Sequence, residues 1–292
     1  MQMRRVSTFK ENMIYYGKGL LKGMEADHCF LFASGIAYNV LLCIIPLSLV
    51  LFEIFSIILQ NNDHAKRAVL HYITRSLPIE SYGQTLNDWV QNQFAYVTNV
   101  SYLPGIIALI VLLWLASALF SSLRSAVNGI FNFPTTRNFA ILKLKDIGVI
   151  FVVSFLLLIT ILIGPVIRGL QHVSNDVLPE FLSSFIHSTI ITIIPLAVGL
   201  ALYMYLYHFL PHRTIPWRAS MIATLVTMTL IEIMKYVFVF YLDKISRISA
   251  LYGAYAFLVA IAFWSYYVAI VFTIGAEIAK LYMLRKGLTP AN

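Results

Sequence analysis

Three charged residues stand inside long apolar stretches of this sequence: Glu53, Glu232 and Lys235. An ionised side chain in the hydrocarbon of a bilayer costs about 2.5–3.5 kcal/mol on the insertion scale, so each needs a partner or a wet cavity. Glu232 and Lys235 are three residues apart, which places them on one helix face where they can pair. Counting from Trp217 puts Glu232 roughly 22 Å along its helix, at about the height expected for Glu53. Two readings stay open: a substrate or proton site between helices, or an internal Glu–Lys pair with Glu53 reaching the interface.

A second set of charged residues is expected at the opposite ends of the helices. Arg124 ends one apolar stretch, Arg218 opens another, and Glu277 lies near the close of the last. An arginine–carboxylate lock between helices there would form a cytoplasmic gate, and breaking it would open a path. The alternative is ordinary packing of helix ends with snorkelling arginines.

Helix-breaking residues occur within three of the apolar stretches. Interrupted helices expose backbone groups where they line a cavity, as in transporters, although prolines are also common in membrane helices in general. The expected helix breaks are Pro46, Gly164, Pro165 and Pro195.

The sequence offers little for catalysis. His208 and His212 have the spacing of a helical metal pair, but Pro211 lies between them and no cysteine or carboxylate is close enough in sequence to complete a site. His64 and His71 could share a face of a loop. No G-x-S-x-G, Walker or dinucleotide-binding motif is present. We therefore expect no enzyme activity, no metal and no cofactor.

The composition defines the class of protein that must position these residues. Hydrophobic residues make up 60% of the 292, against roughly 45–50% in an ordinary soluble domain, and charged residues only 12%. A soluble core could not absorb that excess without leaving apolar surface in water. The expected fold is all-α: a polytopic membrane protein with six transmembrane helices and interfacial amphipathic helices.

The division of the chain follows from the apolar stretches, each long enough to cross a bilayer as a helix. Residues 1–29 are expected to form a cytoplasmic amphipathic leader, with a solvated leader as the alternative reading, and residues 286–292 a cytoplasmic tail. The 60–101 stretch is expected to be an extracytoplasmic cap loop. A single domain, 30–285, holds the six spans, at about 30–59, 102–123, 147–167, 186–210, 217–242 and 250–283.

The distribution of lysine and arginine predicts the orientation. Of 21 such residues, 14 flank the spans on the side of the N-terminus and 6 on the other side. Because basic residues mark the cytoplasmic side, both termini should be cytoplasmic. The net charge of +8 thus reflects topology, and no nucleic-acid partner is expected.

Short motifs in a characteristic order give the chain a family resemblance. They are Ala37-Tyr38 with Pro46, then Trp114 and Asn128, Pro216-Trp217-Arg218, Tyr252-Gly253-Ala254, Trp264 and Gly275-Ala276-Glu277. Over about residues 30–285 the sequence resembles the YihY/BrkB family of bacterial inner-membrane proteins, whose members have six predicted helices. The residues that carry the family motif are Tyr38, Trp217, Tyr252, Gly253 and Gly275. The chain departs from the family pattern at residues 39–43, where the family has a longer polar stretch.

The resemblance implies a bacterial cytoplasmic-membrane protein. Some members once bore the label ribonuclease BN, since regarded as misassigned, and others are tied to suspected export of lipid-like envelope molecules. We expect a translocator of a lipid-like or amphipathic envelope molecule, which acts through an inter-helix cavity and contacts membrane lipids. The alternative is a non-transporting envelope scaffold, and a membrane-bound ribonuclease is the third reading. A homo-oligomer or an envelope partner protein fits either of the first two.

Overall fold

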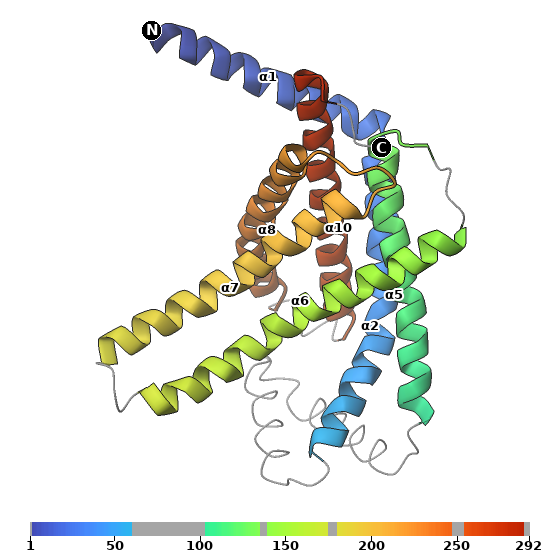
Figure 1. Ribbon diagram of the computed structural model, residues 1–292, viewed down its shortest axis with the longest axis vertical. Coiled ribbons are helices and arrows are strands. Elements are labelled where there is room, and N and C mark those ends of the chain that lie inside the picture. The colour runs from blue at the N-terminus through green and yellow to red at the C-terminus, as the bar shows by residue number, and fades with distance from the viewer. Residues whose placement is uncertain (1, 60–102, 135–138, 175–179, 247–253, 289–292) are drawn as a thin grey trace.

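The computed structural model describes residues 2–59, 103–134, 139–174, 180–246 and 254–288 (Figure 1). Every element in this part of the chain is an α-helix, which confirms the expected all-α class. The cap loop predicted at 60–101 lies outside the described residues. The helices are α1 (Gln2–Ala26), α2 (Cys29–Leu59), α5 (Leu103–Ile130), α6 (Phe139–Ser174), α7 (Glu180–Phe209), α8 (Trp217–Ser246) and α10 (Ala254–Lys286).

The helices carry the apolar surface of a membrane protein. Four stretches are long and apolar enough to cross a bilayer: Cys29–Leu51, Gly105–Ile130, Trp217–Phe240 and Leu258–Lys286. A shorter apolar helical segment covers Ile193–Phe209. Large apolar side chains such as Trp114 and Phe151 are 71% exposed, as expected of surfaces that face lipid. The protein is therefore a multi-pass membrane protein, and these described residues alone supply four of its spans.

Helix α10 packs against both α2 and α8, and one close contact explains a glycine in it. A Cβ atom added at Gly275 would lie 2.1 Å from Thr227 Oγ1 and 2.5 Å from Tyr207 Oη. The Tyr207 hydroxyl donates to the Phe272 carbonyl at 2.7 Å and shares a 2.7 Å hydrogen bond with Thr227 Oγ1. Gly275 thus leaves room for a buried polar contact that joins α7, α8 and α10.

The expected helix breaks need a correction. Helix α2 continues through Pro46, α7 through Pro195 and α6 through positions 164 and 165. Each proline removes only one backbone hydrogen bond, and neighbouring helices can hold the chain on either side of it. The side chains at 164 and 165 lie outside the described part of the structure. The helices are therefore not interrupted at these four residues.

Helix α1 packs across the end of α10, so the first and last helices meet at one end of the bundle (Figure 1). Gly19 and Gly23, one turn apart, form the contact. A Cβ at Gly19 would lie 3.1 Å from Leu281, and one at Gly23 would lie 2.0 Å from Glu277 Oε1. Beyond α1, the Asp27 carboxylate and the Lys280 ammonium form an ion pair. The part of the leader whose side chains the structure describes is therefore a helix docked against α10.

Candidate functional site

Helix α5 carries a stripe of polar side chains within a mostly apolar sequence. Ser117, Ser121, Ser125 and Asn128 follow one another at intervals of four, four and three residues. This spacing places them on one side of the helix. The helices next to that side are α2 and α6, which both contact α5.

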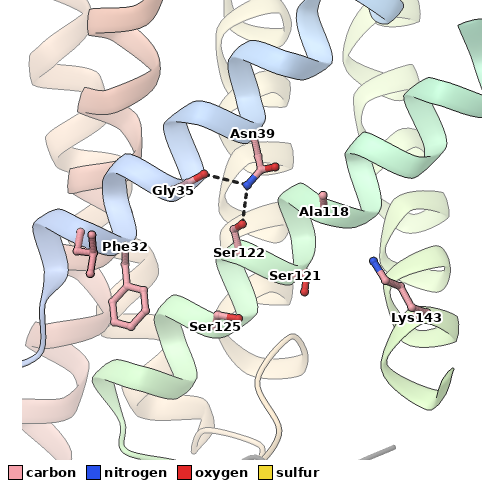
Figure 2. A pocket seen from close by; sticks show the side chains of 9 residues that line it. Phe32, Gly35, Asn39, Ala118, Ser121, Ser122, Ser125 and Lys143 are labelled. Atoms are coloured by element: carbon pink, nitrogen blue, oxygen red, sulfur yellow. Dashed lines mark hydrogen bonds between the residues drawn. The ribbon is translucent and has the colours of Figure 1, made fainter. Parts of the chain in front are cut away.

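A pocket of about 330 Å³ lies between α2 and α5 (Figure 2). The Asn39 amide of α2 spans its wall, because Nδ2 donates to the Gly35 carbonyl at 2.9 Å and to Ser122 Oγ at 2.7 Å. Hydroxyl groups of α5 line the facing wall. Nine residues line the pocket: Leu31, Phe32, Gly35, Asn39, Ala118, Ser121, Ser122, Ser125 and Lys143.

Lys143 brings a positive charge to this pocket from the third helix. Its side chain reaches from α6 towards α5 (Figure 2). Lys143 Nζ donates to Ser117 Oγ at 2.9 Å. No acidic side chain is among the nine residues that line the pocket. The pocket therefore combines hydroxyl groups, one amide and one cation.

Beside the serine stripe, a buried ion pair joins α5 to α6. The Arg124 guanidinium and the Asp146 carboxylate make two parallel contacts, one of them Nη2 to Oδ2 at 2.9 Å. Their side chains are only 4% and 0% exposed. Nη1 of Arg124 also donates to the Leu142 carbonyl at 3.4 Å. The pair neutralises both charges, as burial of ions requires.

A second pocket, of about 450 Å³, continues from the first and shares Ser121 and Ser125 with it. The turn after α7 contributes His212 to its lining. Asn128 of α5 holds this turn in place: His212 N donates to Asn128 Oδ1 at 2.9 Å, and Asn128 Nδ2 lies 3.2 Å from His212 Nδ1. Lys145 supports the same turn by donating to the Pro211 carbonyl at 2.9 Å. We call the two pockets together the polar groove.

Comparison with known proteins finds a family that covers most of the chain. The model of the family described as virulence factor BrkB matches residues 20–290.

The chain belongs to the BrkB family.

A UPF0761 membrane protein of Rhodospirillum centenum is 26% identical over 258 residues, which cover 85% of this chain and 53% of that protein. The chain thus spans about half the length of this curated relative. No solved structure matches.

In this BrkB-family chain the structure brings Glu232 and Lys235 together, with Lys235 Nζ 2.5 Å from Glu232 Oε1. Their side chains are 39% and 53% exposed, respectively, on the surface of α8. Neither lines the polar groove. Glu53 falls in α2, and its side chain lies outside the described part of the structure.

The three residues expected to form a cytoplasmic gate lie apart. The carboxylate partner of Arg124 is Asp146 on α6, because the two helices cross where both side chains are buried. Arg218 is exposed at the start of α8. Glu277 is 1% exposed and packs against Gly23 of α1. Its Oε2 has no hydrogen-bond partner among the described residues. The expected lock of Arg124 and Arg218 on Glu277 is therefore corrected to an Arg124–Asp146 pair.

The family-motif residues have different positions. Tyr38 and Trp217 are exposed, and Gly275 lies in the buried contact of three helices. Tyr252 and Gly253 are outside the described residues.

The two histidines considered as a metal pair serve the turn after α7. His208 Nδ1 lies 2.7 Å from the Ile215 carbonyl, while His212 contacts Asn128. Among the described residues, no group of three or more His, Cys, Asp or Glu side chains could hold a metal ion.

Sequence reasoning missed the groove itself, although one signal was present. Serines at 117, 121 and 125, followed by Asn128, recur on one face of an apolar helix. Charges attracted attention first because each is costly in a membrane. The contributions of Asn39 and Lys143 depend on how α2 and α6 pack against α5, which spacing along the chain does not give.

Proposed function

We propose that this protein translocates a lipid-like or amphipathic molecule across the bacterial cytoplasmic membrane, with the polar groove as part of the path. The observation that carries the proposal is the position of the groove: hydroxyl, amide and cationic groups line a cavity between helices whose outer surfaces are apolar. A polar headgroup crossing the membrane needs such groups in place of water.

The groove also has a suitable boundary with the apolar exterior. Leu31 lines the first pocket and is 70% exposed on α2. An amphipathic molecule could therefore place its polar part among the serines while its apolar part stays outside the helices. A soluble polar substrate would make no use of the apolar boundary.

The proposal includes six spans with both termini in the cytoplasm. It is supported by the excess of basic residues on the side of the termini and by α1 and the end of α10 lying at one end of the bundle (Figure 1). Helices α6 and α7 would supply the two further crossings. Fusions of cytoplasm-active and periplasm-active reporters after residues 134, 174 and 246 test this topology, and a periplasmic signal at 134 would contradict it.

Lipid movement in proteoliposomes tests the function. Labelled phospholipid in the inner leaflet should become accessible to a membrane-impermeant quencher at a rate that depends on the protein. Ser121→Leu places apolar volume where the two pockets meet, and we expect it to slow movement at least about tenfold. Ser125→Leu, at an exposed position in the same groove, serves if Ser121→Leu fails to fold.

The matched control is Glu232→Ala, which removes an exposed carboxylate outside the groove. Movement by the native protein that both groove variants retain would remove the groove from the path. Correctly inserted protein without movement would instead favour the scaffold reading, in which cross-linking recovers a stoichiometric envelope partner or a second copy of the chain.

A further inference from the structure

Helix α10 buries a carboxyl group that lies outside both pockets of the polar groove. Glu277 is 1% exposed, and its Oε2 has no hydrogen-bond partner among the described residues. Buried polar groups in folded proteins are nearly always paired, so an unpaired carboxyl oxygen needs an explanation. We propose that Glu277 is a proton-binding site, and that its proton holds α1 against α10. The site does not depend on the proposed translocation.

The charges around Glu277 leave one carboxylate without a counter-charge. Helices α1, α2, α5 and α8 pack against α10. Among the described residues, the charged groups that act on Glu277 are Asp27, between α1 and α2, and Lys280 of α10. These two already form an ion pair, with side chains 11% and 18% exposed. Two carboxylates against one ammonium would leave a net charge of −1 in this buried cluster, and one bound proton makes it neutral.

The remaining titratable neighbour of the cluster supplies no positive charge. The Cys29 thiol at the start of α2 is 0% exposed and lies close enough to interact with Glu277, Asp27 and Lys280. A thiol is neutral or negative, so it cannot compensate a carboxylate. The proton is therefore the compensating charge that these residues themselves allow.

A contact between the two carboxyl groups shows where the proton is needed. The side chains of Glu277 and Asp27 are in hydrogen-bonding contact. Ionised carboxylates offer only acceptors, so a hydrogen bond between two carboxyl groups requires a proton on one of them. Asp27 accepts from the Lys280 ammonium, which assigns the proton to Glu277.

The packing of α1 favours a proton over a larger cation. A Cβ atom added at Gly23 would lie 2.0 Å from Glu277 Oε1 and 2.7 Å from its Cδ, so the backbone of α1 covers the carboxyl group directly. A metal ion such as Ca²⁺ takes six to eight oxygen ligands. Here one of the two carboxylates is already occupied by Lys280.

The same contact links the proton to the position of α1. Loss of the proton would place an unpaired negative charge against α1 at Gly23, and a buried charge without a partner is strongly unfavourable. When α1 moves away, water can reach the carboxylate and solvate it. The docked state therefore binds one more proton than the undocked state, so docking should weaken as the pH rises.

Infrared spectroscopy of the full chain in lipid nanodiscs tests the proton directly, because protonated and ionised carboxyl groups absorb at different frequencies. At about pH 6, where ordinary exposed glutamates are ionised, we expect a protonated-carboxyl band that Glu277→Gln removes. The matched control Glu25→Gln makes the same change at an exposed position of α1 and should keep the band. A native spectrum without the band, or a band that Glu277→Gln retains, would overturn the site.

Hydrogen exchange of the α1 amides tests the link to docking. After correction for intrinsic exchange rates, protection in the native protein should fall at least about tenfold between about pH 6 and pH 9, since each unit of difference in proton affinity between the two states is a factor of ten. Glu277→Gln cannot ionise and should keep its protection, whereas Glu25→Gln should follow the native protein. Equal pH dependence in the native protein and Glu277→Gln would overturn the link.

Asp27→Asn tests the charge count and serves if Glu277→Gln fails to fold. It frees the Lys280 ammonium, which lies three residues from Glu277 on one helix face and can pair with it. The cluster is then neutral without a bound proton, so the infrared band and the pH dependence of exchange should both disappear. A band that persists in Asp27→Asn would contradict the charge count and with it the proposal.

Discussion

Two ion pairs in this protein have the same chemistry and opposite surroundings. Arg124 and Asp146 join α5 to α6 with side chains 4% and 0% exposed, whereas Glu232 and Lys235 pair within α8 with 39% and 53% exposed. The first pair connects two helices, and the second connects two turns of one helix. The exposed pair can rearrange, because the long lysine side chain can extend towards an interface. The buried pair has no such freedom.

The comparison shows that a charged pair inside an apolar stretch can lie outside the polar groove. The exposed pair lies outside both pockets, while the buried pair borders the polar groove through Arg124. What distinguishes the groove is the set of neutral polar side chains around it. The following substitutions test this difference, from the largest expected effect to the smallest.

Asp146→Ala should have the largest effect, because it leaves the Arg124 guanidinium buried without a carboxylate. Breaking a buried pair in this way costs about 3–5 kcal/mol. We expect a large fall in the apparent melting temperature of the purified protein and in the yield of inserted protein. The double variant Arg124→Met with Asp146→Leu should recover most of the loss, since it removes both charges together. A single variant as stable as the native protein would contradict the buried-pair assignment.

Gly275→Ala tests the contrast between a buried contact of several helices and an exposed helix surface at positions that carry no charge. The new Cβ would overlap Thr227 Oγ1 and Tyr207 Oη, and overpacking of this kind costs about 1–3 kcal/mol. The matched control is Gly148→Ala on α6, where a Cβ would meet nothing within 4 Å. Thermal unfolding should separate the two variants. Equal melting temperatures would mean that α8 and α10 do not approach as closely as the structure shows.

Asn39→Ala should have a smaller effect on stability, because it removes one hydrogen bond between α2 and α5. Hydrogen bonds between membrane helices average about 0.6 kcal/mol. Comparison with Ser48→Ala, whose hydroxyl bonds only its own helix at the Ile45 carbonyl, controls for loss of a polar group. A fall in melting temperature as large as that of Asp146→Ala would show that Asn39 supports far more than one contact.

Glu232→Ala should have the smallest effect, because exposed ion pairs contribute only about 0.2–1 kcal/mol. Lipid movement should stay within about twofold of the native rate. The proteoliposome quenching experiment measures it directly, with Lys235→Ala as the companion variant. Loss of movement in both would transfer the path from the groove to the surface of α8.

The sequence predicted those parts of the structure that depend on local spacing. The Glu232–Lys235 pair needs only the geometry of one helix, and apolar length alone indicated the helical membrane fold. The family motifs identified the family. The Arg124–Asp146 pair could not be predicted in the same way, because its partners lie on different helices and their meeting depends on how α5 and α6 cross. The same reason explains why Asn39 and Lys143 were not connected with the serine stripe.

The ion pair between Asp27 and Lys280 can form only late in the synthesis of this protein. The two residues are separated by 253 positions in the chain. At a synthesis rate of about 5–20 residues per second, Lys280 is made roughly 13–50 s after Asp27. During that interval α1 has emerged from the ribosome but the surface of α10 that receives Gly19 and Gly23 does not yet exist. Docking of α1 is therefore among the last steps of biogenesis, and a nascent chain that stalls before α10 leaves its first helix exposed to proteases and chaperones.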